Sequence, residues 1–210
     1  MKKIIFMAIA MFSILSYSCK EETTPVPVDE TAGLVKVQEI SNDTNIVELY
    51  TRSGAFLLGY NDVYLRIKNI SKNTYVTDAA VSWNPLMHMM SMTHSCPKSQ
   101  IVKVPGKQSL YKGYLVFQMP GNASEHWTLV LSGMAGGNAF MLEDTIAVPN
   151  TAKKRVTVVT GTDSKKYILA LVVPETPSVA LNDMTLGLFS MQSMMSFPVV
   201  KDYTVDIDPR

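Results

Sequence analysis

The sequence contains few of the residues from which most catalytic sites are built. Its 210 residues include two cysteines, Cys19 and Cys96, and three histidines. It has no glycine-rich phosphate loop, no His-Glu-x-x-His pattern and no paired-carboxylate motif. Cys96 and His94 lie two residues apart, without a third group that would orient them as nucleophile and base. We therefore expect a protein that is not an enzyme.

An excess of charge of either sign is also missing. The chain has 19 Lys and Arg residues and 18 Asp and Glu residues, which give a formal net charge of +1. Removal of residues 1–18 would take away Lys2 and Lys3 and leave 17 basic and 18 acidic groups. No basic patch or run remains, so the sequence predicts no nucleic-acid partner.

Long apolar runs are absent after the N-terminal leader. The run Tyr167–Val173 stops at Pro174, whereas a membrane-spanning helix needs about 20 apolar residues. No later stretch repeats apolar side chains every 3.6 residues over about 11 positions, which excludes a convincing amphipathic helix. We expect membrane contact through a lipid alone.

Residues 1–18 have the pattern of an export signal. Lys2 and Lys3 precede the apolar run Ile4–Leu15, which is too short to span a bilayer. Small residues then lead to Cys19, an arrangement that resembles a bacterial lipobox and implies cleavage before Cys19 and lipidation of its thiol. An ordinary secretory signal with another cleavage site is the alternative.

The residues after Cys19 indicate an anchored, surface-facing protein. Lys20-Glu21-Glu22 resembles the signal that sends lipoproteins of Bacteroidetes-type bacteria to the cell surface. Thr23–Thr31 contains two prolines among small and acidic residues, which is typical of an extended tether. We expect residues 19–32 to form a lipidated tether in the cell envelope, on the outer membrane.

The region 33–148 has the pattern of an all-β fold. Short runs of β-branched and aromatic residues alternate with polar ones and are separated by turn signals. About seven such runs predict one immunoglobulin-like antiparallel β-sandwich. The expected strands are Leu34–Ile40, Asn45–Thr51, Asp62–Lys68, Ala79–Trp83, Tyr114–Met119, Trp127–Leu131 and Ala139–Val148.

The pattern begins again after Val148. Asn61–Leu65 parallels Asn182–Leu186, 121 positions later, and Asp78–Pro85 parallels Asp202–Pro209, 124 positions later. We therefore expect residues 149–210 to be an incomplete second immunoglobulin-like repeat, with one face uncovered, in a truncated product or fragment. The alternative is that its strands dock on the first domain as an extra layer. The expected strands are Val156–Thr160, Tyr167–Val173 and Met184–Phe189.

One segment concentrates the ligands of soft metals. Between Pro85 and Pro97 lie four methionines, two histidines and one cysteine. Thioether, imidazole and thiolate are the ligands that copper prefers, and thioethers suit cuprous copper. In extended backbone, alternate residues share a face, whereas a turn would bring in Met87 and Met89 instead. The residues expected on the shared face are His88, Met90, Met92, His94 and Cys96.

Structural explanations compete with a metal site. Methionine is a flexible core filler, and the chain contains 14 methionines, including three at positions 191, 194 and 195 without a nearby histidine in the sequence. Cys96 without a disulfide partner fits either a metal ligand or a small buried apolar residue. His126 beside Trp127 is expected to be an isolated surface residue at a strand end.

Short motifs resemble the YtkA-like (FixH-type) extracytoplasmic domain family. Asp202–Pro209 is similar to the strand that precedes the Met-Pro-x-Met-x-His motif of that family, and Met87–Ser95 sits where the first copy would carry the motif. Tyr114–Met119 followed by Trp127–Leu131 is similar to its aromatic strand pair. The resemblance spans residues 33–209 loosely. It implies an immunoglobulin-like β-sandwich outside a membrane and an association with copper handling.

Two functions follow from these observations. The first is an exported lipoprotein that binds a copper ion through residues 87–96 for delivery or sequestration, with a protein partner in copper handling. The second is an immunoglobulin-like surface lipoprotein that binds no metal and contacts a protein partner through its methionine-rich loop, as flexible methionine surfaces do.

Overall fold

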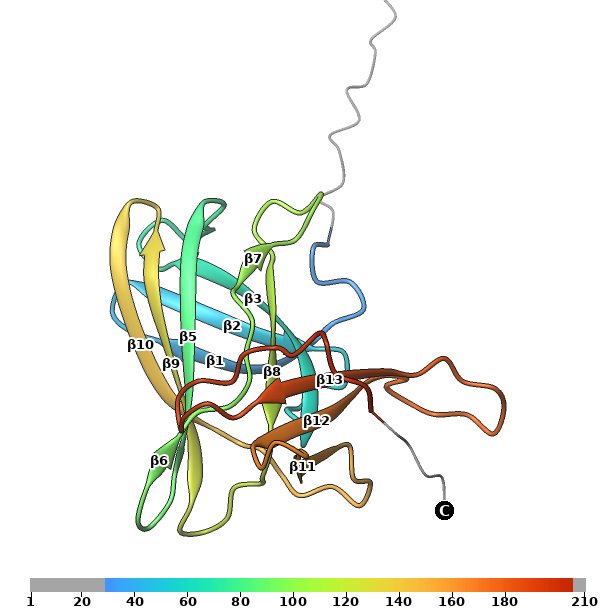
Figure 1. Cartoon of the computed structure of the whole chain (residues 1–210). Coiled ribbons are helices and arrows are strands. Elements are labelled where there is room, and N and C mark those ends of the chain that lie inside the picture. The colour runs from blue at the N-terminus through green and yellow to red at the C-terminus, as the bar shows by residue number, and fades with distance from the viewer. Residues whose placement is uncertain (1–28, 206–210) are drawn as a thin grey trace, which may run out of the picture.

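The computed structural model describes residues 29–205, which form an all-β antiparallel fold of three sheets (Figure 1). Within this range the chain has strands and turns and no helix. Accordingly, no helix in residues 29–205 is long and apolar enough to cross a membrane. The export signal, Cys19 and most of the tether lie outside the described residues.

The strands are distributed over three sheets by their order along the chain. The first sheet has the order β1-β2-β3-β8-β7, with β4 on β3, and the second has the order β10-β9-β5-β6. The third sheet has the order β11-β12-β13. The bounds are β1 Val35–Ser41, β2 Asn45–Thr51, β3 Gly59–Asn69, β4 Thr74–Tyr75, β5 Ala79–His88, β6 Thr93–His94, β7 Val102–Lys103, β8 Tyr111–Phe117, β9 His126–Ala135, β10 Asn138–Ile146, β11 Val156–Thr160, β12 Lys166–Val173 and β13 Thr185–Ser190.

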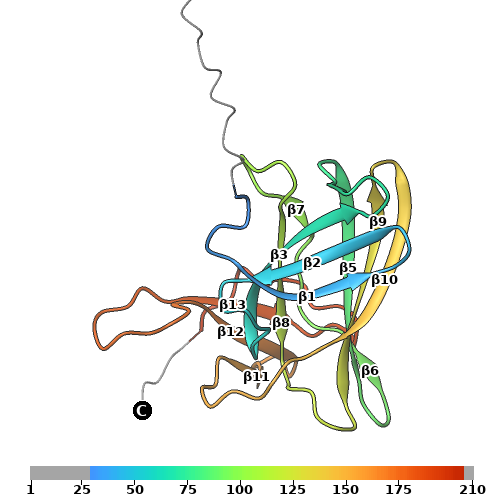
Figure 2. The ribbon, with the colours of Figure 1, turned by 180° about the vertical axis from the view of Figure 1, so that it is seen from behind.

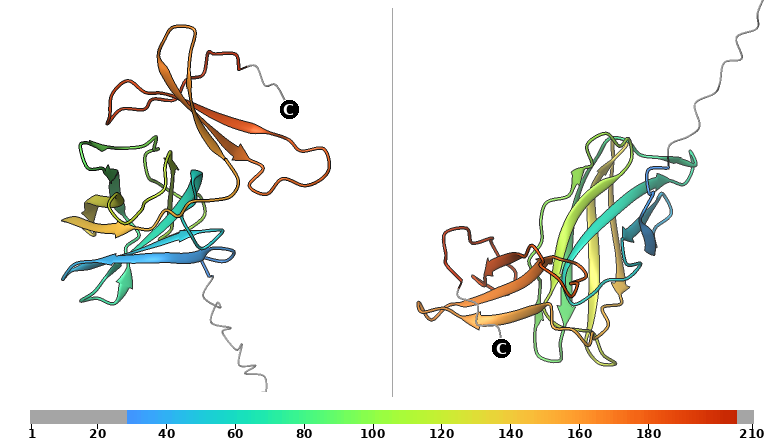
Figure 3. Two further views of the ribbon diagram at one scale, coloured as in Figure 1. Left: turned by 90° about the horizontal axis from the view of Figure 1, so that it is seen from below. Right: turned by 90° about the vertical axis from the view of Figure 1, so that its right-hand side faces the viewer.

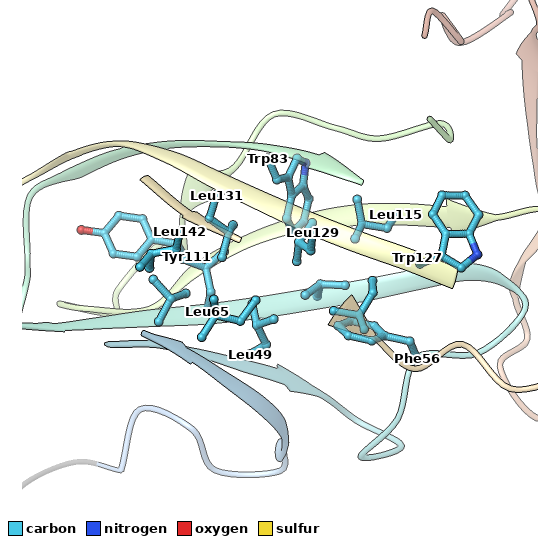
Figure 4. Close-up of a cluster of buried hydrophobic side chains, with 14 of the residues drawn as sticks. Leu49, Phe56, Leu65, Trp83, Tyr111, Leu115, Trp127, Leu129, Leu131 and Leu142 are labelled. Carbon is cyan, nitrogen blue, oxygen red and sulfur yellow. The ribbon is translucent and has the colours of Figure 1, made fainter. Parts of the chain in front are cut away.

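The first two sheets enclose one apolar core (Figure 4). On β3 the strict alternation of the sequence sends Val63, Leu65 and Ile67 inward, and all three are fully buried. Leu129 and Leu131 of β9 are likewise fully buried in the same core. Burial of each such side chain removes apolar surface from water. Truncation of a buried leucine or isoleucine to alanine typically lowers the free energy of unfolding by about 2–5 kcal/mol.

Glycines allow the tight geometry of the β9–β10 hairpin. Gly136 and Gly137 link the two strands with φ angles of 55° and 82°, in the left-handed region that suits a two-residue hairpin turn. Gly133 lies so close to β5 that an added Cβ would meet the carbonyl oxygen of Ala80 at 1.9 Å. Only glycine fits where these two strands approach each other.

The third sheet packs as a separate layer on the outside of the first sheet (Figure 3). Ile168, Ala170 and Phe189 are buried against Val116 of β8, and the rings of Phe189 and Tyr114 lie 6.0 Å apart. This packing matches the alternative considered from the sequence, in which the C-terminal strands dock on the first domain as an extra layer. The opposite face of the sheet carries partly exposed leucines at positions 169, 171, 186 and 188.

The hydrogen bonds of one asparagine side chain in the first sheet recur at the third sheet. The Oδ1 atom of Asn61 accepts from the backbone N–H four residues earlier (2.8 Å), and its Nδ2 donates to the carbonyls four and two residues earlier (2.7 and 2.8 Å). Asn182 makes the same three bonds, at 3.0, 2.9 and 2.7 Å. Both side chains thereby brace the turn before a strand, β3 in one case and β13 in the other.

The segment after each of these strands folds back in the same way. Lys68 on β3 lies opposite Tyr75 of β4, and Phe189 on β13 lies opposite Val199 in an isolated bridge. In both places the next N–H on the returning segment donates to the carbonyl one residue back on the strand, at 2.8 and 2.9 Å. The connection has four residues (70–73) in the first sheet and seven (191–197) in the third.

Candidate metal centre

The methionine and histidine segment forms the β5–β6 hairpin rather than one continuous strand (Figure 2). Strand β5 ends at His88, and the N–H of Met89 donates to the carbonyl of Met92 across the turn (2.9 Å). Strand β6 then pairs back, with His94 opposite Met87 and Thr93 opposite His88. Because paired residues share a face, the expectation of one common ligand face is wrong. His88 and His94 lie on opposite faces of the second sheet.

Two of the expected ligands lie in the core. Met87 is fully buried and Cys96 is 1% exposed, both within the apolar cluster between the first two sheets. Burial raises the pKa of the Cys96 thiol to about 12, so the side chain is a neutral thiol at physiological pH, whereas a metal ligand needs the thiolate. This placement agrees with the apolar role considered for Cys96. Met89 also packs partly against the core.

The other methionines of the hairpin face solvent. The exposed fraction is 89% for Met90, at the tip, and 45% for Met92. Core filling therefore accounts for Met87 and does not account for Met90 and Met92. Their thioethers are accessible ligands that need no deprotonation.

A histidine that sequence reasoning treated as isolated completes a pair. His126 of β9 lies directly opposite His88 of β5. Their ring centroids are 5.1 Å apart and the ring planes differ by 20°. The expectation that His126 is alone is therefore wrong. The signal that would have found it is the long-range register between β5 and β9, because residues 88 and 126 carry no local pattern that links them.

Thr128 holds the His88 ring in place. The Nε2 atom of His88 is 3.0 Å from the Oγ1 atom of Thr128, which leaves Nδ1 of that ring without a protein partner among these contacts. The two imidazoles sit at the end of the sheet next to the hairpin turn. Imidazole nitrogens bind copper in either oxidation state.

His94 is oriented by its neighbours on the opposite face. Its Nδ1 atom lies 2.7 Å from the carbonyl oxygen of Ser95. A carbonyl only accepts, so Nδ1 carries the proton and Nε2 carries the lone pair. The ring also meets Trp127 edge to face, with centroids 5.6 Å apart. This combination of a backbone acceptor on one nitrogen and a free second nitrogen is typical of metal-binding histidines.

The His, Cys, Asp and Glu side chains that the structure describes form no cluster at this place. Within residues 29–205, no group of three or more His, Cys, Asp and Glu side chains is arranged to hold a metal ion. A site on the hairpin would therefore need thioether ligands beside its imidazoles, which selects soft ions over zinc, calcium or magnesium.

Comparisons with known proteins found no relative of this chain. A scan against protein-family models, a search of curated proteins and a search of solved structures each found no match to the chain.

Proposed function

We propose that this chain is an exported lipoprotein that binds a copper ion on its β5–β6 hairpin, for delivery or sequestration. The proposed ligands are His88 and His126, with the thioether of Met90 at the tip of the hairpin. The stacked pair of His88 and His126, with ring centroids 5.1 Å apart at the strand end that precedes the exposed Met90, is the observation that carries the proposal. It revises the ligand set expected from the sequence, because Cys96 is buried and His94 faces the other side.

The chemistry of the site favours binding over catalysis. Two imidazoles and one or two thioethers satisfy cuprous copper, and the imidazoles also hold the cupric ion. A ligand set at the tip of a hairpin is open to a docking partner, so the ion can be passed to another protein in copper handling.

The strand order supports an immunoglobulin-like sandwich as the scaffold. The neighbours β2-β3-β8-β7 follow the A-B-E-D order of that fold, and β5-β9-β10 follow C-F-G. Trp83 lies buried on β5, the strand that would carry the characteristic tryptophan of strand C. Membership of the YtkA-like family is part of this proposal and depends on the motifs in residues 33–209.

The matching details of the first and third sheets support a tandem repeat. Asn61 and Asn182 differ by 121 positions, and Tyr75 and Val199 differ by 124. These are the offsets at which the sequence repeats, and the three additional residues lie in the connection after β13. We propose that residues 149–210 are a second, incomplete copy of the first repeat.

The anchoring proposal depends on the N-terminal sequence. Residues 1–18 would be removed, and a lipid on Cys19 would bind the protein to the outer membrane, with the folded part facing the cell surface. Palmitate incorporation into the wild type and its absence in Cys19→Ala would support this anchor. Equal labelling of both would contradict it.

The copper proposal is tested by metal titration of residues 20–210. Cuprous ion is titrated anaerobically against a chromogenic chelator, and the variants are checked for folding by thermal unfolding. We expect the double variant H88A/H126A to lose affinity at this site at least 10-fold, and H94Q to leave the site unchanged. Equal affinity of H88A/H126A and the wild type would refute the proposal.

A second candidate function uses the same exposed hairpin without a metal. The 89% exposure of Met90 also suits contact with a protein partner through a flexible apolar side chain. Leucine keeps the apolar surface and removes the thioether. M90L/M92L therefore retains partner capture if the contact is apolar, and weakens copper binding if the ligand role is correct. The matched control is M134L/M141L, which changes two exposed methionines on β9 and β10.

A further inference from the structure

A second methionine-rich segment lies beside the hairpin. The connection after β13 contains Met191, Met194 and Met195. Met194 and Met195 are 48% and 47% exposed, whereas Phe197 anchors the end of the segment in the core beneath the third sheet. Backbone bonds between residues 192 or 193 and Ser196 close the segment into a compact turn. We call residues 191–197 the methionine loop.

The methionine loop contacts the segment that follows β6. The backbone N–H of Ser95 donates to the carbonyl oxygen of Met194 at 2.8 Å. In Figure 1 the red stretch after β13 reaches the base of the β5–β6 hairpin. From standard backbone dimensions, this bond brings the Cα atoms of His94 and Met194 to within about 8 Å of each other. Side chains of histidine and methionine bridge such a separation through one ion.

His94 presents the complementary nitrogen. Its Nδ1 proton is donated to the carbonyl of Ser95, and Trp127 supports the ring edge to face. The Nε2 lone pair is therefore the free coordinating atom. His94 lies on the face of the second sheet opposite to His88, so it belongs to a different site from the His88–His126 pair.

Core packing explains Met191 of the methionine loop but not Met194 and Met195. Half of each side chain at positions 194 and 195 is in water, so neither residue fills a gap. The connection is three residues longer than its counterpart after β3, and these two methionines lie within the longer connection. The methionine loop is bonded to the residue that follows His94, and two thioethers with one oriented imidazole are a ligand set of cuprous copper.

We propose that His94 Nε2 and the thioethers of Met194 and Met195 form a second, cuprous-selective site between the hairpin and the methionine loop. This inference rests on the proposed copper role and adds a site with separate ligands. The site joins the second sheet, through His94 of β6, to the connection after β13 of the third sheet through one ion. Since thioethers are soft ligands, cuprous copper is preferred there over the cupric ion.

The test measures how many cuprous ions bind to residues 20–210 and to each of four variants. The wild type is expected to bind two cuprous ions, and M194L/M195L and H94Q are each expected to bind one. H88A/H126A is expected to lose the other ion. The control M134L/M141L removes two exposed thioethers elsewhere and is expected to bind two. Sulfur scattering in the X-ray absorption spectrum of H88A/H126A reports the remaining thioether site.

The outcomes separate this inference from the proposed function. If M194L/M195L binds the same number of ions with the same affinities as the wild type, the second site is refuted, and a loss in H88A/H126A still supports the first. If M194L/M195L loses one ion and H88A/H126A loses none, the first site is refuted and the second is supported. A wild type that takes up no copper contradicts both.

Discussion

His88 and His126 stand directly opposite each other on β5 and β9, with ring centroids 5.1 Å apart, although 38 positions separate them in the sequence. The register of two long antiparallel strands creates this pair. The relationship makes the two histidines equivalent in one respect, since each offers one imidazole to a site at this end of the sheet.

The equivalence predicts matched effects of single substitutions. His88→Ala and His126→Ala should each lower cupric affinity about 10-fold or more, because each removes one of two imidazole ligands. The measurement is the nitrogen hyperfine pattern of the bound cupric ion by electron paramagnetic resonance, together with affinity. A normal signal in His126→Ala would show that His126 is no ligand.

The buried thiol of Cys96 predicts a dependence of stability on high pH. The folded-state pKa of about 12 lies above the unfolded value near 9, so the folded state holds a proton that the unfolded state releases. Ionisation of the thiol in the unfolded state therefore lowers the free energy of unfolding as pH rises from about 9 toward 12, by up to about 1.4 kcal/mol per pH unit. Below pH 8 it has no such effect.

Cys96→Val isolates this contribution, because it keeps an apolar side chain of similar size. We expect the denaturant-unfolding free energy of the variant to fall less steeply than that of the wild type above pH 9. Parallel curves would mean that the thiol titrates normally. Native Cys96 should also resist alkylation at pH 8 and react after unfolding.

The two bracing asparagines predict a graded loss of stability. Asn61 is buried and makes three hydrogen bonds to the turn before β3, so Asn61→Ala should cost about 1–3 kcal/mol. Asn182 makes the same bonds with more exposure to water, so Asn182→Ala should cost less. Urea unfolding of both variants compares the two, and a larger loss in Asn182→Ala would contradict the expected order.

The attachment of the third sheet predicts local unfolding when its anchor is removed. Phe189 is buried against the first sheet, and Phe189→Ala should cost about 3–5 kcal/mol of packing. Hydrogen exchange should accelerate in β11–β13 and remain slow in β3 and β9. Val158→Ala is the control, because Val158 lies on the same sheet and is exposed. Uniform acceleration throughout the chain would show that the three sheets unfold as one unit.

The strands were largely predictable because each depends on local alternation. Asn45–Thr51 and Val156–Thr160 have the predicted bounds, and β3 and β12 differ from prediction by a few residues. The prediction of an all-β antiparallel fold is confirmed. The two-residue strands β4, β6 and β7 were missed, since two residues carry no periodic pattern.

The candidate site was less predictable because it depends on contacts between distant residues. The turn at Met89–Met92 contains no glycine, proline or asparagine, so the segment looked like a continuous strand. The pairing of His126 with His88 and the contact of Met194 with Ser95 follow from register and from docking of the third sheet. Neither leaves a local signal in the sequence.

Copper K-edge X-ray absorption on the cuprous-loaded chain tests the central claim most directly. The wild type should show imidazole nitrogen and thioether sulfur in the first shell, and H88A/H126A should retain less copper after desalting, with fewer imidazole nitrogens and more thioether sulfur per copper. Wild-type protein that keeps no copper through desalting, or a double variant with the same copper content and spectrum as the wild type, would contradict the account.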